Sequence, residues 1–238
     1  MTRNIIVIGG ESVEDMTRMT PIDEHIVKSS GKTRPSVLYI STANGDDRIK
    51  ICDFIAKYET AGCTVTTLAF FIPPFPDAGH ISSLFEQADI IYVAGGNTRA
   101  MLAVWREFGV TGLLKEACEN GKVLCGVSAG AICWFEHGHS DSGGAFALID
   151  GLGLLPGALC PHFSSEAGRK ASFVELVQRD GIQPAYAVDD GAALHFKNGK
   201  CHRTLHNSST SHAYEVAAAA PYLQRISRAP DAATNTPT

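Results

Sequence analysis

A serine between two glycines is the pattern with the clearest chemical meaning in this sequence. An apolar run from Val123 leads into Gly126-Val-Ser-Ala-Gly130, and a second apolar segment follows. Where a strand turns abruptly into a helix at Gly-x-Ser-x-Gly, the serine hydroxyl projects at the carboxyl end of a sheet. The pattern predicts Ser128 as a nucleophile and the backbone N–H of Ala129 as an oxyanion donor. The alternative, in which Ser128 only caps a helix in a glycine-rich turn, stays open.

A serine hydroxyl is a poor nucleophile until a base takes its proton. Among the nine histidines of the chain, His162 follows the turn-rich segment 151–157 and precedes a predicted helix. It therefore lies at the end of an element, where functional side chains are commonly placed, whereas His195 lies inside a predicted strand and His202 and His206 belong to a predicted hairpin. Position favours His162 as the base.

A metal is the alternative use of histidine in this chain. His137 and His139 form a His-x-His pair, but no third ligand stands at a suitable spacing. We expect this pair to lie in a solvated loop, and we expect no metal and no cofactor.

An acid that orients the imidazole would complete a triad. Asp189 and Asp190 follow a short apolar strand and precede Gly191. Two adjacent acids at a strand end cannot both face inward, so one would orient His162 while the other faces solvent or caps the turn. Either could serve at this stage, and an ordinary turn aspartate is a competing interpretation for each.

A second oxyanion donor is expected in the turn Gly95-Gly96-Asn97-Thr98, which ends one predicted strand and opens a helix. Its N–H groups could bind an oxyanion or a phosphate. The turn lacks the lysine of a P-loop and the spacing of a dinucleotide fingerprint, and Gly9-Gly10 lacks that spacing as well. Nucleotide binding is therefore the weaker interpretation.

The elements that position these residues alternate between strand and helix. Near-continuous apolar runs predict buried strands, and longer amphipathic stretches between them predict helices. This alternation predicts an α/β fold with a mostly parallel sheet between layers of helices. The predicted strands are 5–8, 37–41, 65–70, 90–94 and 123–127, and the predicted helices are 47–61, 81–87 and 98–119.

The second half of the chain reads as turns, one helix and short strands. A helix is predicted over 165–179, strands over 185–188, 192–196, 200–205 and 213–217, and a C-terminal hairpin at Asn198-Gly199. We expect one catalytic domain over residues 1–226 and a disordered tail over 227–238.

Composition narrows the class of protein. The chain has 238 residues, a net charge of −5 and 45% hydrophobic residues, which argues against a basic nucleic-acid binder and gives no polybasic reason for membrane association. The sequence shows neither a signal peptide nor an apolar run long enough to span a bilayer. Seven scattered cysteines without a CxxC pair favour a reducing cytoplasm. A homodimer is left open.

Taken together, Gly-Gly-Asn-Thr at 95–98, Gly-Val-Ser-Ala-Gly-Ala at 126–131, Pro-His at 161–162 and Asp-Asp-Gly at 189–191 resemble the peptidase E (aspartyl dipeptidase) group of serine peptidases, with cyanophycinase a more distant relative. The resemblance covers roughly residues 5–217 and implies a class I glutamine amidotransferase-like, flavodoxin-like three-layer fold. The chain order of nucleophile, histidine and acid agrees with that fold and differs from the order in α/β-hydrolases.

The resemblance implies a set of roles. They are Ser128 as nucleophile, His162 as base, Asp190 as acid with Asp189 still possible, Gly96 and Ala129 as oxyanion donors, and Asn97 and Arg169 as substrate-binding residues.

The implied activity is hydrolysis of short peptides as an exopeptidase or dipeptidase. A preference for N-terminal Asp follows if Arg169 binds the acidic side chain, and a solvated Arg169 is the alternative. A cyanophycinase-like or other amide or ester hydrolase, and a non-catalytic binding module with the same fold, are the competing functions.

Overall fold

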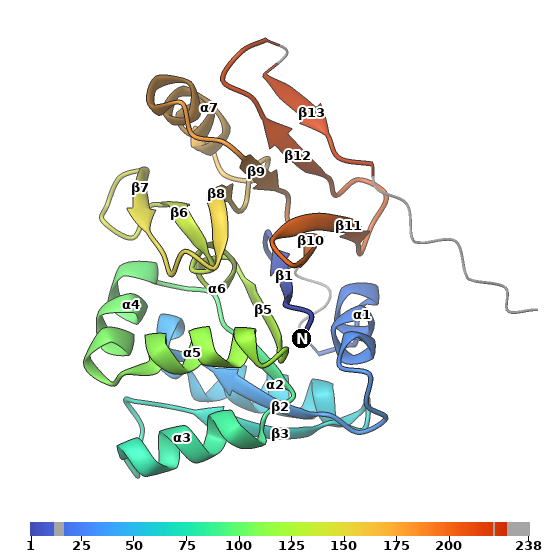
Figure 1. The fold of residues 1–238 in the computed structure, drawn as a ribbon, viewed down its shortest axis with the longest axis vertical. Helices are drawn as coiled ribbons and strands as arrows, with labels where there is room; N and C mark the ends of the chain where they lie inside the picture. Colours follow the sequence, from blue (N-terminus) through green and yellow to red (C-terminus); the bar gives the residue numbers. More distant parts are fainter. Residues whose placement is uncertain (12–16, 221, 228–238) are drawn as a thin grey trace, which may run out of the picture.

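Two β-sheets form the framework of the computed structural model, which describes residues 1–11, 17–220 and 222–227 (Figure 1). The first sheet has seven strands in the order β11-β10-β1-β5-β4-β2-β3. Its strands are β1 (Asn4–Ile8), β2 (Ser36–Ile40), β3 (Thr64–Leu68), β4 (Ile90–Val93), β5 (Val123–Val127), β10 (Ala192–Lys197) and β11 (Lys200–His206). The five strands β1 to β5 pair in parallel, and the hairpin β10–β11 adds antiparallel to β1. The parallel sheet and the hairpin are confirmed.

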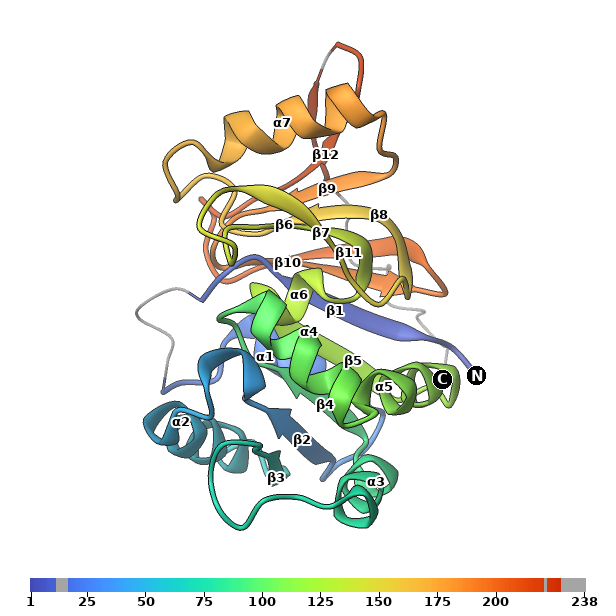
Figure 2. The same ribbon diagram turned by 90° about the vertical axis from the view of Figure 1, so that its left-hand side faces the viewer.

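Helices cover both faces of the first sheet, as the continuous apolar strands predict. The residues of each strand alternate between the two faces: Ile6 and Ile8 pack with α1 and α2, whereas Ile5 and Val7 belong to the core on the opposite face. Figure 2 shows these helical layers on either side of the strands. The helices are α1 (Pro21–Ser29), α2 (Arg48–Glu59), α3 (Ala78–Gln87), α4 (Thr98–Glu107) and α5 (Val110–Glu119).

A second sheet of six strands lies against the first, in the order β13-β12-β9-β8-β6-β7. Helix α7 (Arg169–Asp180) packs on its outer face through Phe173 and Val177 (Figure 2). The strands are β6 (Phe135–Ser140), β7 (Ala147–Asp150), β8 (Leu155–Cys160), β9 (Ala185–Val188), β12 (Ala213–Val216) and β13 (Leu223–Arg225). This sheet carries much of the second half of the chain, and four of its strands, β6, β7, β8 and β13, have no counterpart in the sequence prediction.

Several boundaries differ from the predictions. The helix predicted over 98–119 is two helices, because Gly109 adopts a left-handed φ of 72° between α4 and α5. The helix predicted from residue 165 begins at Arg169, after a series of turns. Helix α1 was not predicted, although Thr20 and Asp23 form a capping box at its start. Residues 228–238 of the predicted tail lie outside the described residues.

Within the described part of the chain, no helix combines the length and the apolar character needed to cross a bilayer.

Candidate active site

Ser128 lies in a strained turn between β5 and the short helix α6 (Ala129–Ile132). Its φ of 53° and ψ of −112° lie in a region that residues with a Cβ rarely adopt. Only glycine fits two residues later, because a Cβ at Gly130 would lie 2.2 Å from the carbonyl oxygen of Val93 on the neighbouring strand β4. The turn therefore has the shape of a nucleophile elbow.

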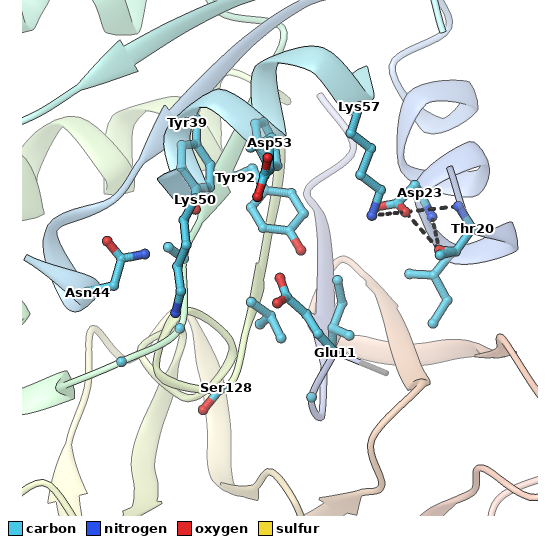
Figure 3. Close-up of a pocket in the computed structure, with 18 of the residues that line it drawn as sticks. Glu11, Thr20, Asp23, Tyr39, Asn44, Lys50, Asp53, Lys57, Tyr92 and Ser128 are labelled. Carbon is cyan, nitrogen blue, oxygen red and sulfur yellow. Dashed lines mark hydrogen bonds and ion pairs between the residues drawn. The ribbon is translucent and has the colours of Figure 1, made fainter. Parts of the chain in front are cut away.

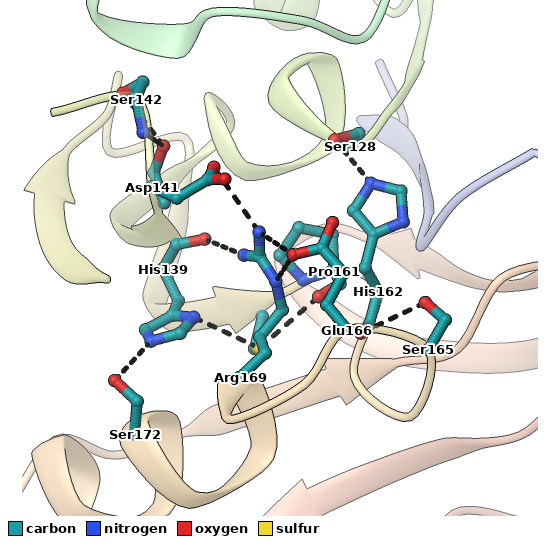
Figure 4. A network of polar contacts seen from close by, with 12 residues as sticks. Ser128, His139, Asp141, Ser142, Pro161, His162, Ser165, Glu166, Arg169 and Ser172 are labelled. Atoms are coloured by element: carbon teal, nitrogen blue, oxygen red, sulfur yellow. Dashed lines mark hydrogen bonds and ion pairs between the residues drawn. The ribbon is translucent and has the colours of Figure 1, made fainter. Parts of the chain in front are cut away.

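His162 follows strand β8 of the second sheet and reaches across to Ser128 (Figure 4). The distance from its Nε2 to the Ser128 Oγ is 2.8 Å, and the distance from its Nδ1 to Asp190 Oδ1 is 2.6 Å. Since a carboxylate only accepts hydrogen bonds, Nδ1–H donates to Asp190 and the Nε2 lone pair faces the serine hydroxyl. The three groups form one hydrogen-bonded chain.

The geometry distinguishes the two adjacent acids. Asp190 contacts His162, whereas Oδ2 of the buried Asp189 accepts a hydrogen bond from the backbone N–H of His212 at 3.1 Å. Partial burial acts to raise the pKa of Asp190, but hydrogen bonds from His162 and Ser165, together with the charges of His162 and Arg169, outweigh it and lower that pKa. Asp190 is therefore ionised near neutral pH.

The Gly9-Gly10 pair at the end of β1 allows the histidine and the acid to meet. A Cβ at Gly10 would lie 1.8 Å from Asp190 Oδ1 and 2.6 Å from His162 Nδ1. The backbone of the same segment accepts hydrogen bonds from the N–H of His162 (to Gly9, 3.3 Å) and of Gly191 (to Gly10, 2.9 Å). Thus β1 holds both segments in place, a role that the sequence analysis did not assign to these glycines.

Two segments can provide oxyanion donors beside Ser128. Ala129 is the first residue of α6, and first-turn N–H groups of a helix have no intrahelical acceptor. The turn after β4 passes next to the elbow, since a Cβ at Gly95 would lie 3.2 Å from the Ser128 Cβ, and Gly96 lines the same pocket as Ser128. Both predicted donors lie at the site.

A pocket of about 290 Å³ opens beside Ser128 and His162 (Figure 3). Aromatic rings of Tyr39, Phe54 and Tyr92 form part of its wall. Charged side chains of both signs also line it: Glu11, Asp23, Lys50, Asp53 and Lys57.

The charges in this pocket are unevenly paired. Lys57 contacts Asp23, while Lys50 extends from α2 with its ammonium directed toward the Ser128 end of the pocket (Figure 3). Glu11 is exposed as a residue, but its carboxylate points into the pocket (Figure 3), where desolvation raises its pKa against the opposing charges of Lys57 and Lys50. The pocket can therefore receive a ligand that carries both an ammonium and a carboxylate.

These pocket residues were not predicted from the sequence, although one face of helix α2 carries a signal for them. Lys50, Asp53, Phe54 and Lys57 recur at helical spacing on one face of α2. A polar face that points at the carboxyl ends of parallel strands indicates a lined pocket.

Comparison with known proteins assigns the chain to a family. The sequence profile of the peptidase S51 family matches residues 5–204, which is most of the chain. The chain belongs to peptidase family S51. It is thus a serine peptidase of the peptidase E-like family, as its motifs predict.

Two similar sequences illustrate the S51 relationship. An uncharacterized peptidase of Bacillus subtilis (strain 168), YgaJ, is 38% identical over 214 residues, which cover 90% of this chain and 92% of that protein. Peptidase E of Haemophilus influenzae is 28% identical over 138 residues, which cover 50% of this chain and 60% of that protein.

Two solved structures share the S51 fold described above. A peptidase from an acI-B1 Actinobacterium superposes with a TM-score of 0.72 at 16% identity, covering 97% of this chain and 96% of that one. A putative peptidase E from Listeria monocytogenes EGD-e gives a TM-score of 0.65 at 19% identity, covering 87% of this chain and all of that one. They confirm the α/β fold.

The two residues that the resemblance assigns to substrate binding lie outside the pocket lining. Asn97 caps helix α4, since its side-chain oxygen accepts a hydrogen bond from the N–H of Ala100 at 2.9 Å. Arg169 is only 2% exposed, so it is not the solvated charge considered as its alternative. Its guanidinium contacts Glu166 at 2.6 and 2.7 Å and donates to the carbonyl oxygen of His139 at 3.1 Å (Figure 4).

The expectation of a solvated His-x-His loop is wrong. His137 and His139 lie on strand β6, and His139 is buried between Ser172 Oγ at 3.0 Å and Cys160 Sγ at 3.4 Å. Burial and the nearby Arg169 lower the pKa of His139 to about 4. No cluster of three metal-ligating side chains occurs among the described residues.

Proposed function

We propose that this peptidase is an exopeptidase or dipeptidase that cleaves short peptides through an acyl-enzyme on Ser128. The observation that carries the proposal is the hydrogen-bonded chain from Ser128 through His162 to Asp190, with contacts of 2.8 and 2.6 Å. This chain stands at one end of a lined pocket. Such an arrangement is what an activated serine requires.

In the first half-reaction, Ser128 Oγ forms a bond to the carbonyl carbon of the peptide while its proton passes to His162 Nε2. Asp190 holds the ring in the required tautomer and stabilises the imidazolium. The tetrahedral intermediate then breaks its C–N bond, and His162 gives the proton to the leaving amine. In the second half-reaction water attacks the acyl-enzyme by the same route and releases the free acid and Ser128.

The negative charge of the tetrahedral intermediate needs fixed donors. The N–H groups of Gly96 and Ala129 are the proposed pair, supported by their positions on the two turns that meet at Ser128. Each donor of this kind contributes about a hundred- to thousandfold to kcat in serine peptidases.

The pocket supports an exopeptidase, because the N-terminal residue of a peptide brings an ammonium that an internal residue lacks. We assign this ammonium to the Glu11 side of the pocket and an acidic side chain to Lys50, which would give a preference for N-terminal Asp. Asn97 and Arg169 stay in the proposal as residues that border the site. Arg169 would have to leave the contacts with Glu166 and the His139 carbonyl to touch substrate.

The catalytic proposal is tested with a fluorophosphonate probe and a panel of dipeptides. The parent enzyme should be labelled on Ser128, and Ser128→Ala should lose labelling and lose kcat by several orders of magnitude at an unchanged fold. Ser82→Ala, on the outer helix α3, is the matched control and should behave as the parent. Full activity of Ser128→Ala would refute the proposal.

The substrate preference is tested separately with Lys50→Ala and Arg169→Ala. If Lys50 binds the acidic side chain, Lys50→Ala should raise KM for Asp-Xaa peptides about tenfold or more and leave Ala-Xaa peptides nearly unaffected. A loss confined to Arg169→Ala would transfer this role to Arg169. Equal activity on all peptides in the parent would refute the Asp preference while leaving the acyl-enzyme proposal intact.

A further inference from the structure

A second cavity, of about 500 Å³, lies between helix α1 and the strands β1, β10 and β11. None of its lining residues lines the pocket beside Ser128. Six of its nine lining side chains are basic: His25, Lys28, His195, Lys197, His202 and Arg203. The other three are polar, and none of the described residues that line the cavity is acidic. This concentration is notable in a chain whose net charge is −5.

The basic side chains converge because of the secondary structure that carries them. On α1, His25 and Lys28 are three residues apart and lie on one face of the helix. On β10, His195 and Lys197 are two residues apart and lie on one face of the sheet. The sheet face and the helix face point at each other across the cavity.

A β-bulge adds the remaining two basic residues. In the β10–β11 pairing, His195 is opposite Arg203 and Phe196 is opposite Cys201, so His202 is the extra residue. Regular alternation would direct His202 and Arg203 to opposite faces, but a bulge re-aims the side chains. Both therefore line the cavity.

A chain of hydrogen bonds fixes the two central histidines as neutral donors. Nε2 of His195 lies 3.2 Å from the Asn4 Oδ1, which can only accept, so His195 carries its proton on Nε2. Its Nδ1 then accepts from His25 Nε2–H at 3.0 Å. Neither ring offers a lone pair to a metal from these atoms, and the neighbouring lysines would repel a cation.

The charges around the cavity also disfavour a cation and favour an anion. Desolvation and then the positive charges of Arg203, Lys197, His202 and Lys28 lower the pKa of His25 to about 4. Desolvation, His25 and the same positive side chains Lys197, His202 and Arg203 lower the pKa of His195 to about 3. The positive side chains that line the cavity repel one another, and an anion bound there would offset this repulsion.

We propose that this cavity is a binding site for a small anion of the phosphate class, either a diphosphate or a phosphate ester. Three fixed cations, Lys28, Lys197 and Arg203, come from three different elements and can surround a multiply charged group. The hydroxyl group of Thr2, which also lines the cavity, adds a donor. A volume of about 500 Å³ admits a ligand larger than a single phosphate. The proposal is independent of the catalytic role of Ser128.

The test is isothermal titration calorimetry of the full chain with sodium pyrophosphate at pH 7.5 and constant ionic strength. We expect saturable binding with a stoichiometry of one, weakened about tenfold or more in Lys28→Gln and in Lys197→Gln, since each removes one charge-assisted contact. Lys200→Gln, on the same hairpin but outside the cavity lining, is the matched control and should bind as the parent. Ser128→Ala should also bind as the parent.

Inorganic phosphate and a phosphate monoester, titrated in parallel, distinguish the two ligand types within the class. A second readout is the NMR titration of the histidine ring protons, in which pyrophosphate should raise the pKa of His25 in the parent and not in Lys197→Gln. Absence of saturable heat would overturn the proposal. An equal loss of affinity in Lys200→Gln would also overturn it, because it would show attraction by overall surface charge rather than binding in the cavity.

Discussion

The Gly10→Ala substitution provides a strict test of the catalytic geometry, because it adds one methyl group at the contact between His162 and Asp190. The added carbon would lie 1.8 Å from Asp190 Oδ1. A carbon and an oxygen need roughly 3.3 Å, so the carboxylate has to move by about 1.5 Å. Gly10 does not have a left-handed φ, so alanine introduces a steric clash without backbone strain.

The displacement is large compared with the hydrogen bond that it disturbs. The Nδ1–Oδ1 distance is 2.6 Å, and a hydrogen bond of this kind is weak beyond about 3.2 Å. A shift of this size therefore breaks the hydrogen bond, and Asp190 then no longer holds the His162 proton on Nδ1. Loss of the tautomer in a serine triad lowers kcat about ten-thousandfold, and a misplacement of about 1 Å lowers it about a hundredfold. We expect Gly10→Ala to reduce kcat within this range.

The assay is the rate of dipeptide hydrolysis together with the rate of fluorophosphonate labelling, both at fixed pH. Gly112→Ala is the matched control, because the methyl group added on helix α5 meets no atom within 4 Å apart from the nearby backbone of the helix itself. That variant should keep the parent kcat and gain a little helix stability. In an Asp190→Ala background, Gly10→Ala should cost much less than it does alone, since the two residues act as a unit. A folded Gly10→Ala enzyme with the parent kcat would refute the reasoning.

Three further predictions follow from contacts described above. Asp190→Asn should lower kcat by about ten-thousandfold, whereas Asp189→Asn should mainly reduce thermal stability; similar small losses in steady-state assays would remove both from the triad. Arg169→Ala should reduce the free energy of unfolding by about 1–3 kcal/mol, because it removes a buried guanidinium that donates to the carbonyl oxygen of His139, and an unchanged urea midpoint would contradict this. His139 and His195 have folded-state pKa values of about 4 and about 3, below the ordinary 6.5, so the unfolded chain binds more protons in acid. Calorimetry should therefore show stability falling steadily as the pH drops from 6.5 toward 4, and a flat profile would show that these rings are protonated in the folded state.

The elbow could be predicted from sequence because its determinants are local. A buried strand, a serine and a glycine two residues later suffice to define the turn. The choice of Asp190 over Asp189 could not be predicted from local sequence, because it depends on pairing between Gly10 and Asp190. These two residues are remote in the chain. Two adjacent aspartates carry no local signal that distinguishes them.

Strands β6, β7 and β8 of the second sheet were missed for a different physical reason. Strand β6 contains Glu, Gly, Ser and two His residues, and β8 starts Leu155-Pro-Gly. These sequences have weak strand propensity, and they form strands because they pair with one another and pack under α7 and against the first sheet. Tertiary contacts of this kind are not visible in a single sequence.

The basic cavity could not be predicted from the sequence either, although several of its residues lie on predicted strands. His195, His202 and Arg203 are ordinary strand residues until the bulge in β11 turns two of them to the same side. The facing residues of α1 could not be included because that helix was not predicted.

The hydroxyl of Ser128 and its two amide neighbours belong to the first 130 residues of the chain, whereas the imidazole and the carboxylate arrive with strands β8 and β9 of the other sheet. In the proposed mechanism, the amino-terminal half of the chain therefore carries the nucleophile and the oxyanion donors, whereas the second half supplies the base and the acid. Hydrolysis by this proposed mechanism requires that synthesis has passed residue 190 and that the two sheets have docked.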